Sequence, residues 1–206
     1  KLILYITVLE ETINTDIKFK SNGKITVFPD ATLIIDNSTL DYCGEVSGKW
    51  KGIEADDGAF PPIISINNSE IKDAETGLDI GVVRNIPGRT SPTINITGSN
   101  FINNGVHIKA VSYNGESYIF DTDFSYGVGI QLTNSENFTI DNCNFSEQST
   151  AITAFNSAFE VINESKFEDC WIGVISAGTF PLGSSLYIGN QNSGSGNIFD
   201  GADVGV

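Results

Sequence analysis

The pair of residues best suited to acid–base chemistry is Asp79 and His107, the only histidine in the chain. Each follows a small residue and an aliphatic residue, in Gly77-Leu78-Asp79 and in Gly105-Val106-His107. If the two phrases occupy equivalent positions of a repeat, the carboxylate and the imidazole are neighbours that could exchange a proton with a substrate. No nucleophile joins them, so a surface salt bridge is the favoured interpretation, and both residues are kept as ligand-contacting candidates.

Three acidic residues are candidates for binding calcium. Asp121 and Asp123 precede Phe124, and Asp141 occupies a similar turn position further along the chain. Calcium takes about six to eight oxygen ligands, and neither an EF-hand loop nor a nonapeptide repeat supplies them here. Ordinary solvated turns are therefore the favoured interpretation. No other cofactor is indicated, because the three cysteines have no metal-like spacing.

Two insertions are candidates for a binding surface. Residues 83–92, with Arg84 and Arg89, and residues 178–185, with Phe180, follow the same predicted strand in different repeats. They should project from one flank of the molecule. Insertions on one face of a repeat protein often form its binding face.

A tryptophan offers a further candidate for sugar binding. Trp50 lies in WKGI, and the second tryptophan, Trp171, lies in WIGV. Equivalent positions in the other repeats are polar or small, which predicts that both indoles lie at a corner of the fold, half covered. A structural corner is favoured over a sugar platform. At strand spacing, five repeats separate the two indoles by about 24 Å, which is too far to grip one sugar ring.

A degenerate repeat would position all of these candidates. Its core is an alternating apolar run, then four residues, then a large apolar anchor, as in Ile94-x-Ile96 before Phe101. The runs are Leu33-x-Ile35, Ile64-x-Ile66, Ile94-x-Ile96, Tyr118-x-Phe120, Phe138-x-Ile140, Phe159-x-Val161 and Leu186-x-Ile188, of which the fourth and sixth fit loosely. The anchors are Leu40, Ile71, Phe101, Phe124, Phe145, Phe167 and Phe199. Similarity at a period of roughly 20 to 30 residues indicates a solenoid.

The runs are short, alternate in polarity and are bounded by Asn, Asp, Ser and Gly, which is typical of strands. Helical periodicity and a leucine-rich skeleton are both absent. The sequence therefore predicts an all-β fold, a right-handed single-stranded parallel β-helix of about seven or more coils. We expect one segment over residues 1–206, with N-terminal coils in 1–40 and the anchored coils in 41–206. The chain has no methionine, which suggests an excerpt of a longer protein.

Composition narrows the classes of partner. The chain has 206 residues and a formal charge of −15, from 26 acidic and 11 basic residues. Nucleic acid is an unfavourable partner for such a surface, and an acidic polysaccharide would be repelled unless cations bridge it. No run of about 18 apolar residues is present, so no membrane span is predicted. An acidic charge balance is typical of a soluble secreted protein.

In this architecture the chain resembles the pectate-lyase-like superfamily of right-handed β-helices. Residues 31–59 (ATLIIDNSTLDYCGEVSGKWKGIEADDGA) and 64–80 (ISINNSEIKDAETGLDI) resemble large surface β-helix proteins of Bacteroidota. The resemblance implies export, often by type IX secretion, and a location outside the cell or at its surface.

The same resemblance implies catalytic residues that this chain largely lacks. Pectate lyases of the superfamily use an Arg or Lys base beside calcium-binding acids, and no Arg-x-Pro-x-x-Arg phrase occurs here. Polygalacturonases carry Asp-Asp, Gly-His-Gly and Arg-x-Lys, of which only Asp56-Asp57 is present.

The leading hypothesis is therefore a non-catalytic segment of an exported β-helix protein. It would serve as a rigid stalk or adhesion module that contacts a polysaccharide or other surface proteins. Two alternatives stay open. One is a lyase or glycoside hydrolase whose site lies partly outside this sequence, and the other is a structural component of a larger surface assembly.

Overall fold

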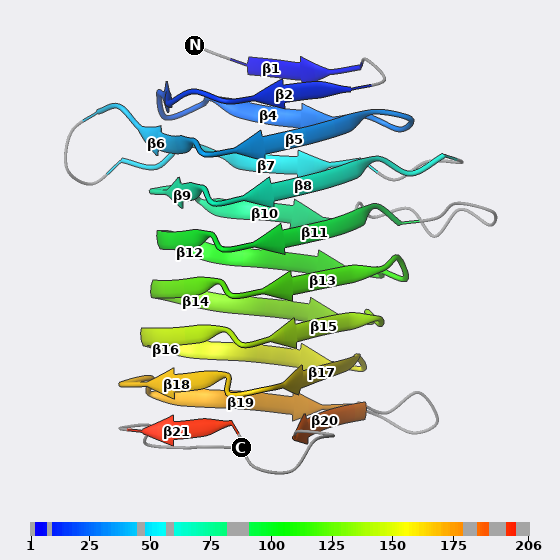
Figure 1. The fold of residues 1–206 in the computed structure, drawn as a ribbon, viewed down its shortest axis with the longest axis vertical. Coiled ribbons are helices and arrows are strands. Elements are labelled where there is room, and N and C mark those ends of the chain that lie inside the picture. The colour runs from blue at the N-terminus through cyan, green and yellow to red at the C-terminus, as the bar shows by residue number, and fades with distance from the viewer. Residues whose placement is uncertain are drawn as a thin grey trace.

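The computed structural model describes residues 3–7, 10–44, 48–56, 60–81, 91–178, 185–189 and 197–200. The described residues form two sheets, and every strand pair in them is parallel (Figure 1). Sheet A contains β1 (Ile3–Ile6), β3 (Ile17–Phe19), β4 (Lys24–Val27), β6 (Thr39–Tyr42), β7 (Gly52–Ala55), β9 (Glu70–Lys72), β10 (Thr76–Ile80), β12 (Asn100–Val111), β14 (Asp123–Thr133), β16 (Asn144–Phe155), β18 (Lys166–Glu168), β19 (Ile172–Ala177) and β21 (Ile198–Asp200). Sheet B contains β2 (Glu11–Ile13), β5 (Thr32–Asp36), β8 (Ile63–Asn67), β11 (Thr93–Thr97), β13 (Ser117–Phe120), β15 (Phe138–Asp141), β17 (Ala158–Ile162) and β20 (Ser185–Gly189).

The chain alternates between the two sheets. Each strand of sheet B pairs with the sheet B strand that follows it in sequence, in the order β2-β5-β8-β11-β13-β15-β17-β20. We call one passage of the chain through sheet B and then sheet A a rung. Successive rungs stack along the long axis of the molecule (Figure 1), so equivalent residues lie about 4.8 Å apart. None of the described residues belongs to a helix that is long and apolar enough to cross a bilayer.

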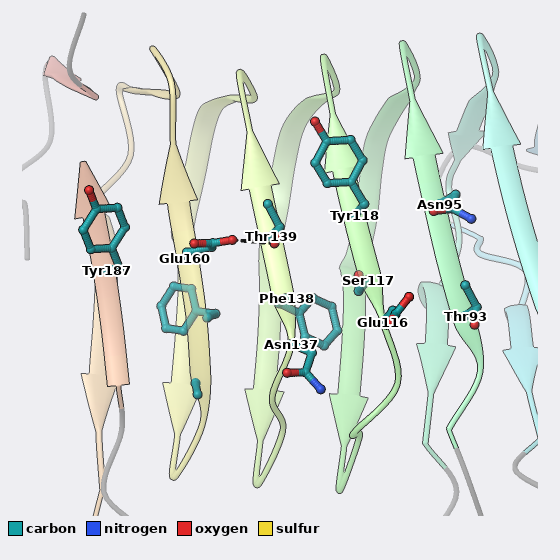
Figure 2. A pocket seen from close by; sticks show the side chains of 12 residues that line it. Thr93, Asn95, Glu116, Ser117, Tyr118, Asn137, Phe138, Thr139, Glu160 and Tyr187 are labelled. Carbon is teal, nitrogen blue, oxygen red and sulfur yellow. Dashed lines mark hydrogen bonds between the residues drawn. The ribbon is translucent and has the colours of Figure 1, made fainter. Parts of the chain in front are cut away.

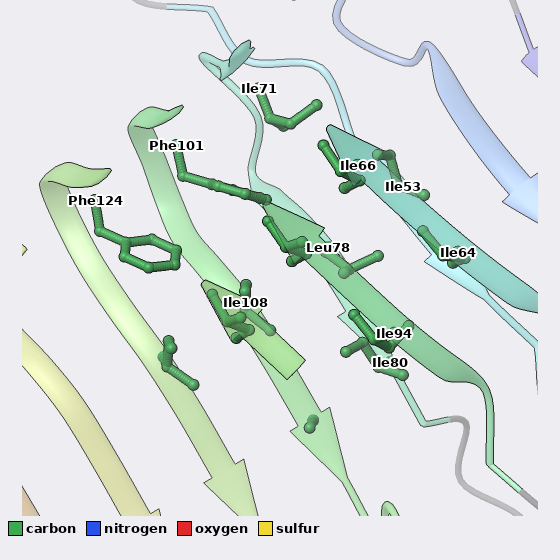
Figure 3. Packing of buried hydrophobic residues seen from close by; sticks show 14 of the residues in the cluster. Ile53, Ile64, Ile66, Ile71, Leu78, Ile80, Ile94, Phe101, Ile108 and Phe124 are labelled. Atoms are coloured by element: carbon green, nitrogen blue, oxygen red, sulfur yellow. The ribbon is translucent and has the colours of Figure 1, made fainter. Parts of the chain in front are cut away.

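The inward side chains of the two sheets share one apolar core (Figure 3). The predicted anchors pair in register from rung to rung, from Leu40 with Ile71 through to Phe167 with Phe199. Three of the phenylalanine contacts between them are stacked, with ring centroids 5.4, 4.8 and 5.0 Å apart. This column confirms the anchor spacing, because a large apolar residue recurs at the same inward position.

Corners between sheet B and sheet A depend on residues that tolerate a left-handed backbone. Asn68 and Asn142 have φ of 47° and 51°, which asparagine adopts at lower cost than most residues. At several corners a buried serine follows, and its hydroxyl oxygen accepts a hydrogen bond from the backbone N–H of the corresponding serine in the preceding rung. Ser38 N donates to Ser69 Oγ at 3.1 Å, and Ser69 N donates to Ser99 Oγ at 3.2 Å. The hydroxyls thereby continue the hydrogen bonding that the turn interrupts.

One predicted run is out of register. The sequence suggested Tyr118 and Phe120 as inward residues, but Ile94 and Ile96 pair with Ser117 and Ile119. Ile119 is fully buried, whereas Tyr118 is 42% exposed. The prediction was wrong by one residue, and a shift of one residue in a strand moves a side chain to the opposite face.

Candidate functional site

The outer face of sheet B carries a column of side chains with one residue from each rung. Register places Asn95, Tyr118, Thr139, Glu160 and Tyr187 next to one another in this order. Figure 2 shows Tyr118 and Tyr187 on this face, with Thr139 and Glu160 on the strands between them. The two tyrosines are three rungs apart, which corresponds to about 14 Å along the stack.

A groove of about 650 Å³ follows this column. It is lined by Thr93, Asn95, Glu116, Ser117, Tyr118, Asn137, Phe138, Thr139, Ala158, Phe159, Glu160 and Tyr187. Its volume falls in the range of about 300–1,000 Å³ that is typical of small-ligand sites. The tyrosines are 42% and 44% exposed, so two aromatic rings are partly open to solvent on this face.

The ring of Tyr118 is held in place by its neighbours. Its hydroxyl donates to Asp141 Oδ2 at 2.8 Å, and Asn163 Nδ2 donates to Asp141 Oδ1 at 2.8 Å. The ring also lies nearly parallel to Phe120, with an interplanar angle of 6° and centroids 6.1 Å apart. Partial burial, together with the hydrogen bond to Asp141, raises the pKa of Tyr118 to about 12. The phenol therefore stays protonated at neutral pH and presents a fixed aromatic face.

The polar groups between the tyrosines form a short hydrogen-bonded series. Thr139 Oγ1 donates to Glu160 Oε1 at 2.8 Å, which leaves the second oxygen of that carboxylate for a ligand (Figure 2). Glu116 and Asn137 are exposed in the adjacent outward column. None of the described residues that line the groove is a lysine or an arginine. The groove therefore offers aromatic faces and hydrogen-bond acceptors together with a negative field.

The two carboxylates of the groove are poorly spaced for glycoside hydrolysis. Glu116 and Glu160 lie two rungs apart, because Ser117 pairs with Phe138 and Phe138 pairs with Phe159. Two rungs correspond to about 10 Å along the stack. Inverting hydrolysis uses carboxyl groups about 6.5–9.5 Å apart, and retaining hydrolysis uses a still shorter separation. The backbones of the two residues are further apart still, because Glu160 lies level with Tyr118, two residues beyond Glu116 along the strand.

The predicted pairing of Asp79 with His107 is wrong. Asp79 pairs with Lys109, whose Nζ lies 3.3 Å from Asp79 Oδ2 in a surface ion pair. Leu78 follows Ile71 by seven positions and Ile108 follows Phe101 by the same interval, so Ile108 rather than Val106 pairs with Leu78. His107 therefore takes the inward position that a small residue holds in neighbouring rungs.

His107 is fully buried and packs against aromatic rings. Its ring centroid lies 6.3 Å from that of Phe101 and 5.7 Å from that of Phe124, and its Nδ1 lies 3.1 Å from Asn104 Nδ2. Burial lowers the pKa of His107 to about 3, and the charge of Lys49 acts in the same direction, while the Tyr126 carbonyl opposes both. The imidazole is neutral at physiological pH and is built into the core.

Trp50 is also more deeply placed than predicted. The indole is fully buried, stacks on Phe19 with centroids 4.3 Å apart, and donates from Nε1 to the Lys72 carbonyl at 2.7 Å. The expectation of a half-covered corner is wrong for Trp50, because its backbone bridges Ala74 in an inward column. Trp171, by contrast, is 65% exposed.

Two of the acidic residues proposed for calcium accept hydrogen bonds from neighbouring side chains. Asp141 accepts hydrogen bonds from Tyr118 and Asn163, and Asn142 Nδ2 donates to Asp121 Oδ1 at 3.3 Å. Partial burial, and then the nearby charge of Asp121, raise the pKa of Asp123. Among the described residues, no group of three or more His, Cys, Asp or Glu side chains is arranged to hold a metal ion. A calcium site at these three positions stays a prediction.

Arg84, Arg89, Phe180 and Asp57 lie outside the described residues. The proposed binding flank formed by residues 83–92 and 178–185 therefore stays a prediction. The groove on sheet B is lined by other residues, and sequence reasoning missed it. Applying the four-residue spacing strictly before Phe124 would have turned Ile119 inward and Tyr118 outward.

Comparisons with known proteins give little beyond this geometry. No model of a known protein family matches the chain, and no curated protein matches it. Among solved structures, the chain is similar to the surface protein and adhesin PfbA of Streptococcus pneumoniae, at 8% identity and a TM-score of 0.29. The alignment covers 89% of this chain and 68% of that chain. A likeness at this level carries no argument, so the case for a function depends on the residues themselves.

Proposed function

We propose that residues 1–206 form one segment of a right-handed single-stranded parallel β-helix with about seven or more coils. The unbroken register of the anchor column and the exclusively parallel pairing support this assignment. The segment would belong to a longer protein that is exported to the cell surface or beyond it. The resemblance to surface proteins of Bacteroidota, and export by type IX secretion, are part of the same proposal.

The segment serves as a rigid, non-catalytic adhesion module that contacts glycans. One observation carries this proposal. The predicted acid–base pair is taken up by structural contacts, while an aromatic groove stays open on the outer face. His107 is buried in the core and Asp79 is paired with Lys109, whereas Tyr118 and Tyr187 stand at the surface. Stacked parallel strands give such a module its stiffness, since each rung is held by its neighbours.

A carbohydrate-active enzyme is the second candidate. It is favoured by a single feature, the presence of Glu116 and Glu160 in one groove with exposed tyrosines. Their separation along the stack argues against a hydrolytic pair, as described above. Full catalysis would then need groups from other parts of the protein.

A cleavage assay separates the two candidates. The chain is incubated with a panel of neutral and acidic polysaccharides, and new reducing ends and unsaturated uronate absorbance are measured. We expect neither signal to rise above that of a protein-free control. Cleavage that disappears in Glu116→Gln or Glu160→Gln, with folding unchanged by circular dichroism, would overturn the non-catalytic assignment.

A further inference from the structure

We propose that the groove between Tyr118 and Tyr187 binds a neutral linear oligosaccharide that lies across the strands of sheet B. The inference rests on the proposed glycan-contacting function and assigns that function a site and a ligand class. The sugar chain would follow the stack axis, so that successive sugar units meet successive rungs. The residues that carry it lie on or next to β11, β13, β15, β17 and β20 (Figure 2).

The tyrosines supply the stacking surfaces. Tyrosine presents an apolar ring with a polar tip, and sugar rings have apolar faces bordered by hydroxyls. The hydrogen bond to Asp141 and the contact with Phe120 already fix the orientation of Tyr118. A side chain that is ordered before binding loses less conformational entropy when the ligand arrives.

The polar side chains between and beside the tyrosines match the hydroxyl groups of a sugar. Glu160 retains an acceptor oxygen beside Thr139, and the amides of Asn95 and Asn137 can both donate and accept. Each sugar hydroxyl needs a donor or an acceptor within reach, and these four side chains offer both kinds. A small number of polar groups placed beside aromatic side chains is typical of a ligand site.

Charge selects a neutral ligand over an acidic one. Glu116 and Glu160 line the groove, and none of its described lining residues is basic. The whole chain carries a formal charge of −15. A uronate or sulfated polymer would meet repulsion along its full length, whereas a neutral glycan would not.

Strand pairing argues against an extended peptide as the ligand. β13 pairs with β11 on one side and β15 on the other, and β15 and β17 are likewise paired on both sides. Their backbone N–H and C=O groups are used within the sheet. A peptide could not extend the sheet at this position and would depend on side-chain contacts alone.

Calorimetric titration of the full chain tests the proposal. The probes are neutral gluco-, xylo- and manno-oligosaccharides, an oligogalacturonate as the acidic comparison, and a lysine-rich peptide as the cationic one. We expect at least one neutral series to bind, with affinity rising with chain length, and the other two probes to bind at least tenfold more weakly.

Variants place the binding in the groove. Tyr118→Ala and Tyr187→Ala should each weaken the affinity about tenfold or more, since each removes one stacking face. Tyr118→Phe keeps the ring and should stay within a few-fold of the unmodified chain. Tyr5→Ala removes a tyrosine that is 57% exposed on β1 of sheet A, and it should leave the affinity unchanged. Unchanged thermal unfolding of the variants shows that lost binding is not lost folding.

Several outcomes overturn the proposal. These are the absence of neutral-glycan binding at millimolar concentration, tighter binding of the oligogalacturonate or the peptide, and a neutral glycan whose affinity survives both alanine substitutions. Reducing ends measured in the same samples keep the two proposals distinguishable. If no neutral glycan binds in the groove and no reducing ends form, the groove proposal fails and the non-catalytic assignment still holds. If a glycan binds and is cleaved, only the non-catalytic assignment fails.

Discussion

The corners at Trp50 and Trp171 share a sequence phrase, yet they place their indoles in opposite surroundings. Trp50 is fully buried, stacks on Phe19 and donates to the Lys72 carbonyl. Trp171 is 65% exposed, and its backbone N–H donates to the Gln148 carbonyl. That bond sets Trp171 level with the exposed Ser149, whereas Trp50 bridges the buried Ala74.

The difference shows that the repeat determines which column a residue joins, while one extra or missing residue at a corner determines which face it occupies. Inward columns of this stack hold the fold together through contacts between rungs. Side chains in the outward columns do not pack in the core, and on sheet B they form the groove between Tyr118 and Tyr187. Substitutions in matched inward and outward positions should therefore separate stability from binding.

The largest effect is expected at the two tryptophans. Trp50→Ala should lower the free energy of unfolding by about 3–5 kcal/mol, because it leaves a cavity against Phe19 and removes a hydrogen bond to the Lys72 carbonyl. Trp171→Ala should change it by no more than about 0.5 kcal/mol. Denaturant unfolding of both variants measures the pair. Equal losses would contradict the assignment of opposite faces.

The phenylalanine column offers the next comparison. Phe124 lies between Phe101 and Phe145, with ring centroids 5.4 and 4.8 Å away, and Phe124→Ala should cost about 3–4 kcal/mol. Phe155→Ala, at a position 45% exposed, should cost less than about 1 kcal/mol. Thermal unfolding monitored by circular dichroism is sufficient to rank them. A smaller loss at Phe124 than at Phe155 would show that the column is not the core.

A pH dependence should follow from the buried His107. The folded state holds the imidazole neutral, with a pKa of about 3, while the unfolded chain binds a proton below its ordinary pKa of about 6.5. The unfolded state therefore binds more protons between these values, and stability falls as the pH falls. The expected loss from this group is about 2 kcal/mol between pH 7 and pH 5. His107→Gln is the control, and its unfolding free energy should lack the pH-dependent loss that the imidazole causes. If the variant and the unmodified chain show the same pH profile, the buried neutral imidazole is contradicted.

The smallest effect is expected in the charged column of sheet A. Lys109 and Asp79 are both partly exposed and 3.3 Å apart, and Lys51 is paired with Glu75 at 2.6 Å. Surface pairs of this kind contribute about 0–1 kcal/mol, so Lys109→Ala should be close to neutral. A double-mutant cycle with Asp79→Ala measures the coupling between the two groups. A coupling well above this range would indicate a structural role that the exposure of the pair does not suggest.

The anchor residues could be predicted from the sequence, because burying a regularly spaced large apolar residue in the core is favourable. Faces were harder to predict wherever the repeat changed length. Val106 was chosen because a glycine precedes it. Leu78, however, follows Ile71 by seven positions, and the same interval from Phe101 leads to Ile108. The small-residue signal failed at His107, where a buried imidazole replaces a glycine.

The groove was partly within reach of the sequence. Assigning Leu186 and Ile188 inward already places Tyr187 outward, because strand side chains alternate between faces. Tyr118 was missed because an aromatic residue was accepted as an inward position in a loosely fitting run. The volume of the groove and the hydrogen bond from Tyr118 to Asp141 depend on side-chain geometry across rungs, which the spacing alone does not contain.

The central claim is that inward columns carry stability while the outward column of sheet B carries recognition. Its most direct test is one titration of a neutral oligosaccharide into the unmodified chain and into the double variant Tyr118→Ala/Tyr187→Ala, with thermal unfolding recorded for both. We predict binding to the unmodified chain, loss of binding in the double variant by about 100-fold or more, and little change in unfolding temperature. Retained affinity in a folded double variant would contradict the account.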